Sequence, residues 1–207
     1  MAKRTIETDY LVVGAGAMGM AFTDALIEYS DVHVTLVDRR HATGGHWRDA
    51  YPFVQLHQAS LFYGVASTVL GTGANQREGP EAGLQERARQ PEIQAYYDDI
   101  LYRRFLTSGR VSFFGGHEYH EEGTRQFVTS RVSGERAQVN VRRRLVDATY
   151  LSPNIPATTL PPFGFADDVR VVPVNELAQL SRVRIHNQNK TTAARAHAER
   201  KTFGHLS

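Results

Sequence analysis

The chain has 207 residues, of which 41% are hydrophobic and 22% charged, so it is long enough and apolar enough to bury a core. It contains no cysteine, which excludes a disulfide scaffold, a cysteine-based zinc site and a redox dithiol. The net charge of +2 hides a split: residues 181–207 hold six Lys or Arg and one acid, so residues 1–180 carry −3 by difference. This mildly acidic body argues against a nucleic-acid partner.

The apolar run at residues 10–22 is too short to span a bilayer, and the acidic Glu7 and Asp9 precede it directly. We therefore predict neither a membrane span nor a secretory signal. A cytoplasmic location is expected, and the lack of cysteine is compatible with it.

The N-terminal region predicts a βαβ unit. Residues 9–14 form a short apolar run that ends in glycine, which is typical of a buried parallel strand. A helix is expected over residues 16–30, because apolar side chains recur there at spacings of three and four: Met18, Ala21, Phe22, Ala25, Leu26 and Tyr29. Residues 33–38 predict a second buried strand, parallel to the first through a right-handed crossover.

The turn between the first strand and the helix carries Gly14, Gly16 and Gly19 in the G-x-G-x-x-G spacing of dinucleotide-binding proteins. The first glycine permits the tight turn, the second lets the backbone approach a pyrophosphate, and the third lets the helix pack closely on the strand. The free N–H groups and positive dipole end of the helix favour phosphates. Asp38, at the end of the second strand, can accept hydrogen bonds from an adenosine ribose.

The rest of the chain predicts a second helix and a small antiparallel sheet. In chain order, we expect a mostly irregular segment over 41–83, a helix over 92–108, a strand over 110–115, a meander within 117–150 with strands near 117–120, 126–132 and 137–145, and a short helix over 175–180. An irregular segment as long as residues 41–83 is usually functional in a compact domain.

Six residues after Asp38 comes Gly44-Gly45-His46-Trp47-Arg48, followed by Tyr51-Pro52. In combination with the glycine turn, this segment resembles flavin-dependent monooxygenases and related NAD(P)/FAD-dependent oxidoreductases, over residues 9–160. The resemblance implies an α/β fold: a Rossmann-type FAD/NAD(P)-binding domain in which a parallel sheet with helices carries an inserted antiparallel β-meander. It also implies FAD as the cofactor, NAD(P)H as the co-substrate, and a position near the flavin for Gly45, His46 and Trp47.

Trp47 and Arg39 allow other interpretations. The Trp47 side chain could cover the flavin ring or fill the interior of the domain. Arg39, directly after the acidic strand end, could bind a ribose 2′-phosphate and make this an NADP site, or could lie at a solvated strand end. The chain could accordingly be an NAD(P)-dependent dehydrogenase with a single site, or a non-catalytic nucleotide-binding remnant. No residue is singled out as catalytic, and no metal site is predicted.

The end of the chain departs from the resemblance, which predicts a second strand–glycine–helix unit for NADPH soon after residue 180. Residues 181–207 are instead polar and basic. We therefore expect an incomplete FAD-binding domain over 1–180 and a basic tail over 181–207 that is disordered or out of frame, as in a protein truncated before its NADPH-binding domain. The small-molecule substrate, the electron acceptor and the oligomeric state do not follow from the sequence.

Overall fold

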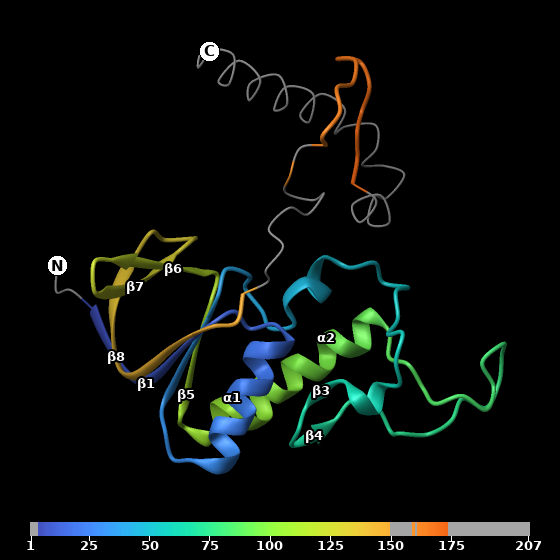
Figure 1. The fold of residues 1–207 in the computed structure, drawn as a ribbon, viewed down its shortest axis with the longest axis horizontal. Helices are drawn as coiled ribbons and strands as arrows, with labels where there is room; N and C mark the ends of the chain where they lie inside the picture. Colours follow the sequence, from blue (N-terminus) through green and yellow to red (C-terminus); the bar gives the residue numbers. More distant parts are fainter. Residues whose placement is uncertain (1–3, 150–158, 160, 174–207) are drawn as a thin grey trace. The chain divides into compact units, whose positions relative to one another are not determined.

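The βαβ unit expected at the N-terminus is confirmed in a computed structural model that describes residues 4–149, 159 and 161–173. It consists of β1 (Arg4–Val13), α1 (Ala17–Tyr29) and β2 (Val34–Asp38) (Figure 1). The strands pair in parallel from Tyr10↔Val34 to Val13↔Val37. The chain divides into two units, residues 1–151 and 152–207, and all the helices and strands described below belong to the first.

The irregular segment after β2 contains short elements: η1 (Gly45–Asp49), η2 (Ser60–Phe62), β3 (Gly64–Val65) and β4 (Thr68–Val69). The helix expected over 92–108 consists of three parts, α2 (Gln90–Asp99), a π-helix η3 (Ile100–Phe105) and a 3-10 turn η4 (Leu106–Ser108). Pro91 stands in its first turn, and Gly109, with φ of +69°, follows its last residue. Four more strands complete the first unit: β5 (Val111–Gly115), β6 (His117–Glu122), β7 (Arg125–Ser130) and β8 (Arg136–Asp147).

The six longer strands form one sheet in the order β5-β2-β1-β8-β7-β6. The first four strands in this order are parallel; β7 then pairs antiparallel with β8, and β6 pairs antiparallel with β7. The predicted Rossmann-type α/β fold with an antiparallel meander is therefore confirmed. The structure adds that β8 belongs to both parts, since it pairs with β7 over its first four residues and with β1 from Ala137 to Asp147.

The long β8 also explains why β1 begins five residues before the expected start. Residues 4–8 pair with residues 137–141 of β8, and a register shift follows between Thr8 and Tyr10. Because Ile6 is the one apolar residue in this half of β1, it lacks the continuous apolar run by which the rest of the strand is recognised.

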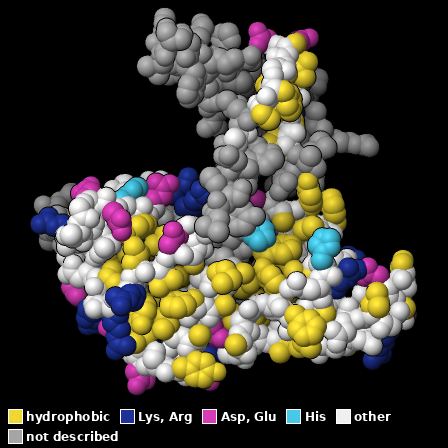
Figure 2. All heavy atoms as spheres, viewed as in Figure 1, with side chains coloured by type: hydrophobic (Ala, Val, Ile, Leu, Met, Phe, Trp, Pro, Cys, Tyr) yellow, Lys and Arg dark blue, Asp and Glu magenta, His cyan; other side chains and the backbone are white. Residues whose placement is uncertain are grey.

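Two apolar clusters cover the two faces of the sheet. The larger lies under α1 and α2 and includes Met20, Leu36, Trp47, Tyr97 and Phe105. The smaller gathers side chains of β1, β2, β7 and β8: Leu11, Val37, Val128, Ala137 and Val139. Other apolar side chains reach the surface in Figure 2, and Met18 and Tyr29 of α1 are 73% and 83% exposed.

Within residues 4–149, 159 and 161–173, no helix is long and apolar enough to cross a membrane. The short helix expected over 175–180 and the basic tail over 181–207 lie outside the described residues.

Candidate dinucleotide-binding site

Two of the three glycines in the turn after β1, Gly14 and Gly19, are required by close backbone contacts. Gly14 has φ of +104°, which favours glycine, and a Cβ there would lie 2.7 Å from the carbonyl oxygen of Ala148, just beyond β8. A Cβ on Gly19 would lie 1.8 Å from the carbonyl oxygen of Gly14, so any side chain would push α1 away from the turn. A Cβ on Gly16 would meet only the Cα of Gly45, at 3.6 Å.

The first turn of α1 is open to an anion. Gly16 is the N-cap residue, and no side chain of the described residues caps the helix. The amide of Met20 donates to the carbonyl of Gly16 at 2.9 Å, so the N–H groups of residues 17–19 precede the first bond inside the helix. Together with the positive end of the helix dipole, these N–H groups provide a site for phosphate oxygens.

The Asp38 carboxylate, at the end of β2, holds the glycine turn in place. Its side chain is 6% exposed; Oδ2 accepts from the amide of Ala15 at 2.7 Å and Oδ1 from the amide of Arg40 at 2.7 Å. Each carboxylate oxygen accepts more than one hydrogen bond, so Asp38 keeps capacity for a ligand hydroxyl while it positions the turn. This second role was not predicted from the sequence, where only the ribose was considered.

The second glycine segment lies directly against the first. The amide of Gly44 donates to the carbonyl of Ala15 at 2.9 Å. Gly45 has φ of +57°, and a Cβ there would lie 2.8 Å from the Cα of Gly16. The residues that the sequence placed along the pyrophosphate and along the flavin are therefore in backbone contact at the carboxyl edge of the sheet.

Trp47 lies inside the domain. Its side chain is 8% exposed, and its indole Nε1–H donates to the hydroxyl of Tyr63 at 2.7 Å. Its carbonyl accepts from the side-chain amides of Gln90 and Gln94 on α2, at 2.9 and 3.0 Å. Trp47 thus anchors η1 to α2, and contact with a flavin remains a prediction for this side chain.

The charged groups around η1 differ in how firmly they are held. The Arg40 guanidinium pairs with Asp49, with Nε 3.1 Å from Oδ2. Partial burial and the charge of Arg40 lower the pKa of His46, while the charge of Asp49 raises it by a smaller amount. The net lowering of the pKa favours a neutral imidazole. Arg39 is exposed, while its carbonyl accepts from the guanidinium of Arg131, the residue after β7, at 3.0 Å.

Several residues of this site were not identified from the sequence. Ala15 and Gly44 contribute through backbone atoms, and Ala148 approaches Gly14 because β8 is the parallel neighbour of β1. The position of Ala148 follows from the pairing of β8 with β1, and the meander pattern does not reveal this pairing. Tyr63 lies sixteen residues from its partner Trp47 in an irregular segment, and no periodicity connects them.

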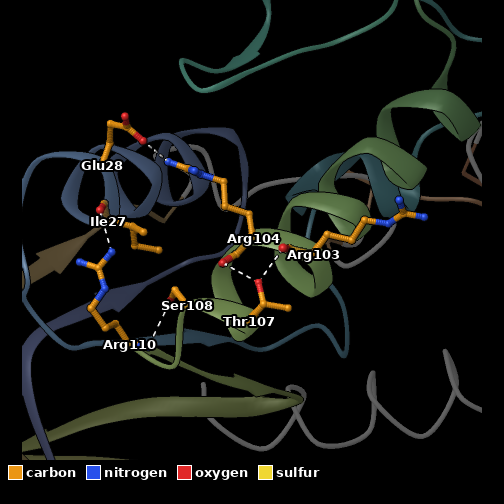
Figure 3. Close-up of a pocket in the computed structure, with 7 residues that line it drawn as sticks. All are labelled: Ile27, Glu28, Arg103, Arg104, Thr107, Ser108 and Arg110. Atoms are coloured by element: carbon orange, nitrogen blue, oxygen red, sulfur yellow. Dashed lines mark hydrogen bonds and ion pairs between the residues drawn. The ribbon is translucent and has the colours of Figure 1, made fainter.

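A separate pocket of about 450 Å³ lies at the other end of α1, beside the residue that precedes β5 (Figure 3). It is lined by Ile27, Glu28, Arg103, Arg104, Thr107, Ser108 and Arg110. Arg104 binds Glu28 and the buried Asp24, and Arg110 donates to the carbonyls of Ile27 and Ser30, so both guanidinium groups hold the end of α1. The side chain of Arg103 points away from the other two (Figure 3). This pocket is therefore a helix-end junction rather than part of the nucleotide site.

Residues 12–75 match the family model of the NAD(P)-binding Rossmann-like domain. This range contains the glycine turn, Asp38 and η1. Together with the strand order, the match shows that the N-terminal part of the chain is a Rossmann-like dinucleotide-binding domain, as the resemblance implied.

Uncharacterized proteins of Mycobacterium tuberculosis and Mycobacterium bovis are 48% identical to this chain over 177 residues. The alignment covers 86% of this chain and 32% of each relative. The chain thus spans about a third of the length of the curated relatives it matches.

Similar solved structures include three oxidoreductases. A flavin-containing monooxygenase from Stenotrophomonas maltophilia is 17% identical, with a TM-score of 0.47 over 69% of this chain and 38% of that one. An oxidized steroid monooxygenase bound to NADP is 26% identical, with a TM-score of 0.47 over 69% and 26%. The bacillithiol disulfide reductase of Bacillus cereus is 14% identical, with a TM-score of 0.49 over 68% and 39%. Because these TM-scores lie below 0.5, the fold assignment rests on the strand order and the family model.

Proposed function

We propose that residues 1–180 are the FAD-binding portion of an NAD(P)H-dependent flavoprotein oxidoreductase of the monooxygenase-like kind. The observation that carries this proposal is the backbone contact between Gly45 and Gly16, beside the carboxylate of Asp38. FAD extends from its pyrophosphate toward the flavin ring, and in this proposal the second glycine segment borders that path, where the glycines keep both segments free of side chains. Residues 181–207 are proposed to be a separate basic tail, and the protein to be cytoplasmic.

In this proposal the chain binds and orients the cofactor. The glycine turn and the first turn of α1 hold the pyrophosphate, Asp38 accepts from the ribose, and Gly45 and His46 line the path toward the flavin ring. When bound, FAD supplies hydride acceptance from NAD(P)H and transfer of electrons to a second substrate. His46, kept neutral by its surroundings, offers either a hydrogen-bond donor or an acceptor without adding charge beside the cofactor.

A second candidate is an NAD(P)-dependent dehydrogenase with a single site. The exposed side chain of Arg39, whose backbone is held by Arg131, favours this reading, since a guanidinium next to the strand end suits a ribose 2′-phosphate. FAD carries no phosphate at that position. Cofactor identity therefore separates the two candidates.

The test is the visible absorption spectrum of the purified chain, recorded before and after incubation with FAD and gel filtration. A retained flavin spectrum is the expected result. A folded but colourless protein that binds NADP would overturn the flavoprotein proposal in favour of the dehydrogenase. Arg39→Ala provides the matched control: it should leave FAD retention unchanged but weaken any NADP binding.

A further inference from the structure

A row of polar side chains on α2 binds η1. Gln90, Gln94 and Asp98 recur at intervals of four residues, so they lie along one side of the helix. The two glutamine side chains donate to the carbonyl of Trp47, at 2.9 and 3.0 Å. The carboxylate of Asp98 accepts from the guanidinium of Arg48. All three members of this row thus hold η1, which continues the second glycine segment.

The guanidinium of Arg48 closes the short loop that contains Gly44 and Gly45. Its Nε donates to the carbonyl of Thr43 at 2.6 Å, so this side chain joins the two ends of the loop. The carboxylate of Asp98 also accepts from the hydroxyl of Thr43 at 3.2 Å, and it therefore holds both ends at once. Thr43 is fully buried and the side chain of Arg48 is 17% exposed, so these bonds are largely shielded from water.

The position of this loop sets the spacing between the two glycine segments. The amide of Gly44 donates to the carbonyl of Ala15 at 2.9 Å, and a Cβ on Gly45 would lie 2.8 Å from the Cα of Gly16. Neither loop glycine has a side chain that could fix the loop, and glycine is the residue with the greatest backbone freedom. Exact placement of the loop therefore depends on bonds from outside it, and α2 supplies them from a regular helix.

We propose that Asp98 is a positioning residue for cofactor binding: through Arg48 and Thr43 it holds the second glycine segment where the flavin half of FAD passes. The inference rests on the proposed function, in which the adenosine diphosphate half of FAD lies on the glycine turn and at Asp38. Because Asp98 holds the segment on the flavin side, its loss should weaken the binding of FAD but not of ADP, which ends at the pyrophosphate. General damage to the fold would weaken the binding of both.

The next carboxylate along the helix, Asp99, forms an ion pair without this role. Its Oδ1 lies 2.6 Å from Nε of Arg103, one turn further along the chain. The two side chains are 50% and 83% exposed, and both belong to the continuous helix formed by α2 and η3. Asp99→Ala therefore removes the same charge and breaks a similar pair one position away without releasing η1, which makes it the matched control.

The experiment uses the full chain and two probes, FAD and ADP, whose dissociation constants are measured by isothermal titration calorimetry. We expect Asp98→Ala to weaken the binding of FAD about tenfold and to leave that of ADP within about twofold. In the chain without ligand, hydrogen–deuterium exchange at the amide of Gly44 should be faster in this variant, because the amide separates more often from the carbonyl of Ala15. Asp99→Ala should match the unaltered chain in all three measurements.

A second variant, Arg48→Gln, breaks the same ion pair from the side of η1. If Asp98 acts through Arg48, the double variant should bind FAD about as weakly as either single variant, since the pair can be lost only once. Effects that multiply in the double variant would overturn this assignment. Urea unfolding of each variant shows that it is folded under the conditions of the binding measurement.

Three further results would overturn the inference. The first is an equal loss of FAD and ADP affinity in Asp98→Ala, which would indicate general damage. The second is an FAD affinity equal to that of the unaltered chain, and the third is an unchanged exchange rate at the amide of Gly44. An unaltered chain that binds ADP but not FAD would instead overturn the proposed function, and the role of Asp98 in FAD binding with it.

Discussion

The two glycine segments of the candidate site lie in contact, yet they are held by opposite means. The turn at residues 14–19 is shaped by the lack of side chains, because backbone atoms occupy the places where Cβ atoms would stand at Gly14 and Gly19. The second glycine segment belongs to the irregular segment over 41–89, which has little regular structure and is held by side chains. Its buried hydroxyls and carboxylates bind backbone groups across long loops, as Ser60 does with the carbonyl of Glu86 at 3.1 Å and the amide of Ala88 at 2.7 Å.

This difference predicts different responses to substitution. The glycine turn should fail abruptly when a single methyl group meets the backbone, because a backbone carbonyl cannot move aside. The irregular segment should weaken stepwise, since each hydrogen bond contributes a modest amount and its loss leaves the others in place. Both kinds of damage should reach the cofactor, because the segments touch at Gly16 and Gly45.

The largest effect is expected for Gly19→Ala. Its Cβ would lie 1.8 Å from the carbonyl oxygen of Gly14, so α1 must shift and the turn must open. We expect a loss of stability of roughly 3 kcal/mol or more, or failure to fold, measured by urea unfolding. Gly16→Ala is the matched control: its Cβ would meet only the Cα of Gly45 at 3.6 Å, so the fold should persist while dinucleotide binding weakens. Equal stability of the two variants would contradict the backbone argument.

The tie between α1 and the irregular segment should be next in size. Asp24 of α1 is 1% exposed and accepts from the amide and hydroxyl of Ser67, at 3.0 and 2.6 Å, and from Nε of Arg104 at 2.6 Å. Asp24→Asn removes the charge partner of a partly buried guanidinium, so we expect about 2 to 3 kcal/mol of lost stability in urea unfolding. The control, Glu28→Gln, weakens an outer ion pair of the same arginine and should cost under about 1 kcal/mol. An Asn variant as stable as this control would mean that α1 does not depend on the tie.

Within the irregular segment, Ser60→Ala tests the stepwise response. Ser60 is fully buried, and alanine would leave the amide of Ala88 without its acceptor, so we expect a loss of about 1 to 2 kcal/mol in thermal or urea unfolding. Thr72→Ala, which removes an exposed hydroxyl contact with Glu86, should change stability by less than about 0.5 kcal/mol. Complete unfolding of the Ser60 variant would show that this segment fails as abruptly as the glycine turn.

The same contrast explains which parts of the site could be predicted from the sequence. Gly14, Gly16 and Gly19 form a local motif whose spacing fixes its geometry, and Asp38 follows from the alternation of strand and helix. The family resemblance implied a position near the flavin for Gly45, but its contact with Gly16 was not predicted. The hydrogen bonds of Trp47 to Tyr63 and to α2 bridge sixteen and more residues without any periodicity, so local patterns carried no sign of them.

The meander shows the same limit at the level of the sheet. Its strands were located to within a few residues, because alternation and turn residues are local signals. The pairing of β8 with β1 joins residues more than 130 positions apart, and it places Ala148 against Gly14. Such long-range pairing depends on which strand edges remain available once the chain has folded, and this was not visible in either strand alone.

The smallest expected effect is a pH dependence at the junction of the two segments. Partial burial and Arg40 lower the pKa of His46 below its ordinary 6.5, so the unfolded chain binds the proton more readily than the folded one. This contribution to stability is complete above about pH 6.5 and is lost as the pH falls through the folded-state pKa. His46→Gln should therefore match the unaltered chain in thermal midpoint at pH 8 and lose less than it between pH 7 and 5. The other eight histidines are common to both proteins, so parallel curves over that range would mean that the junction leaves His46 as free to protonate as in water.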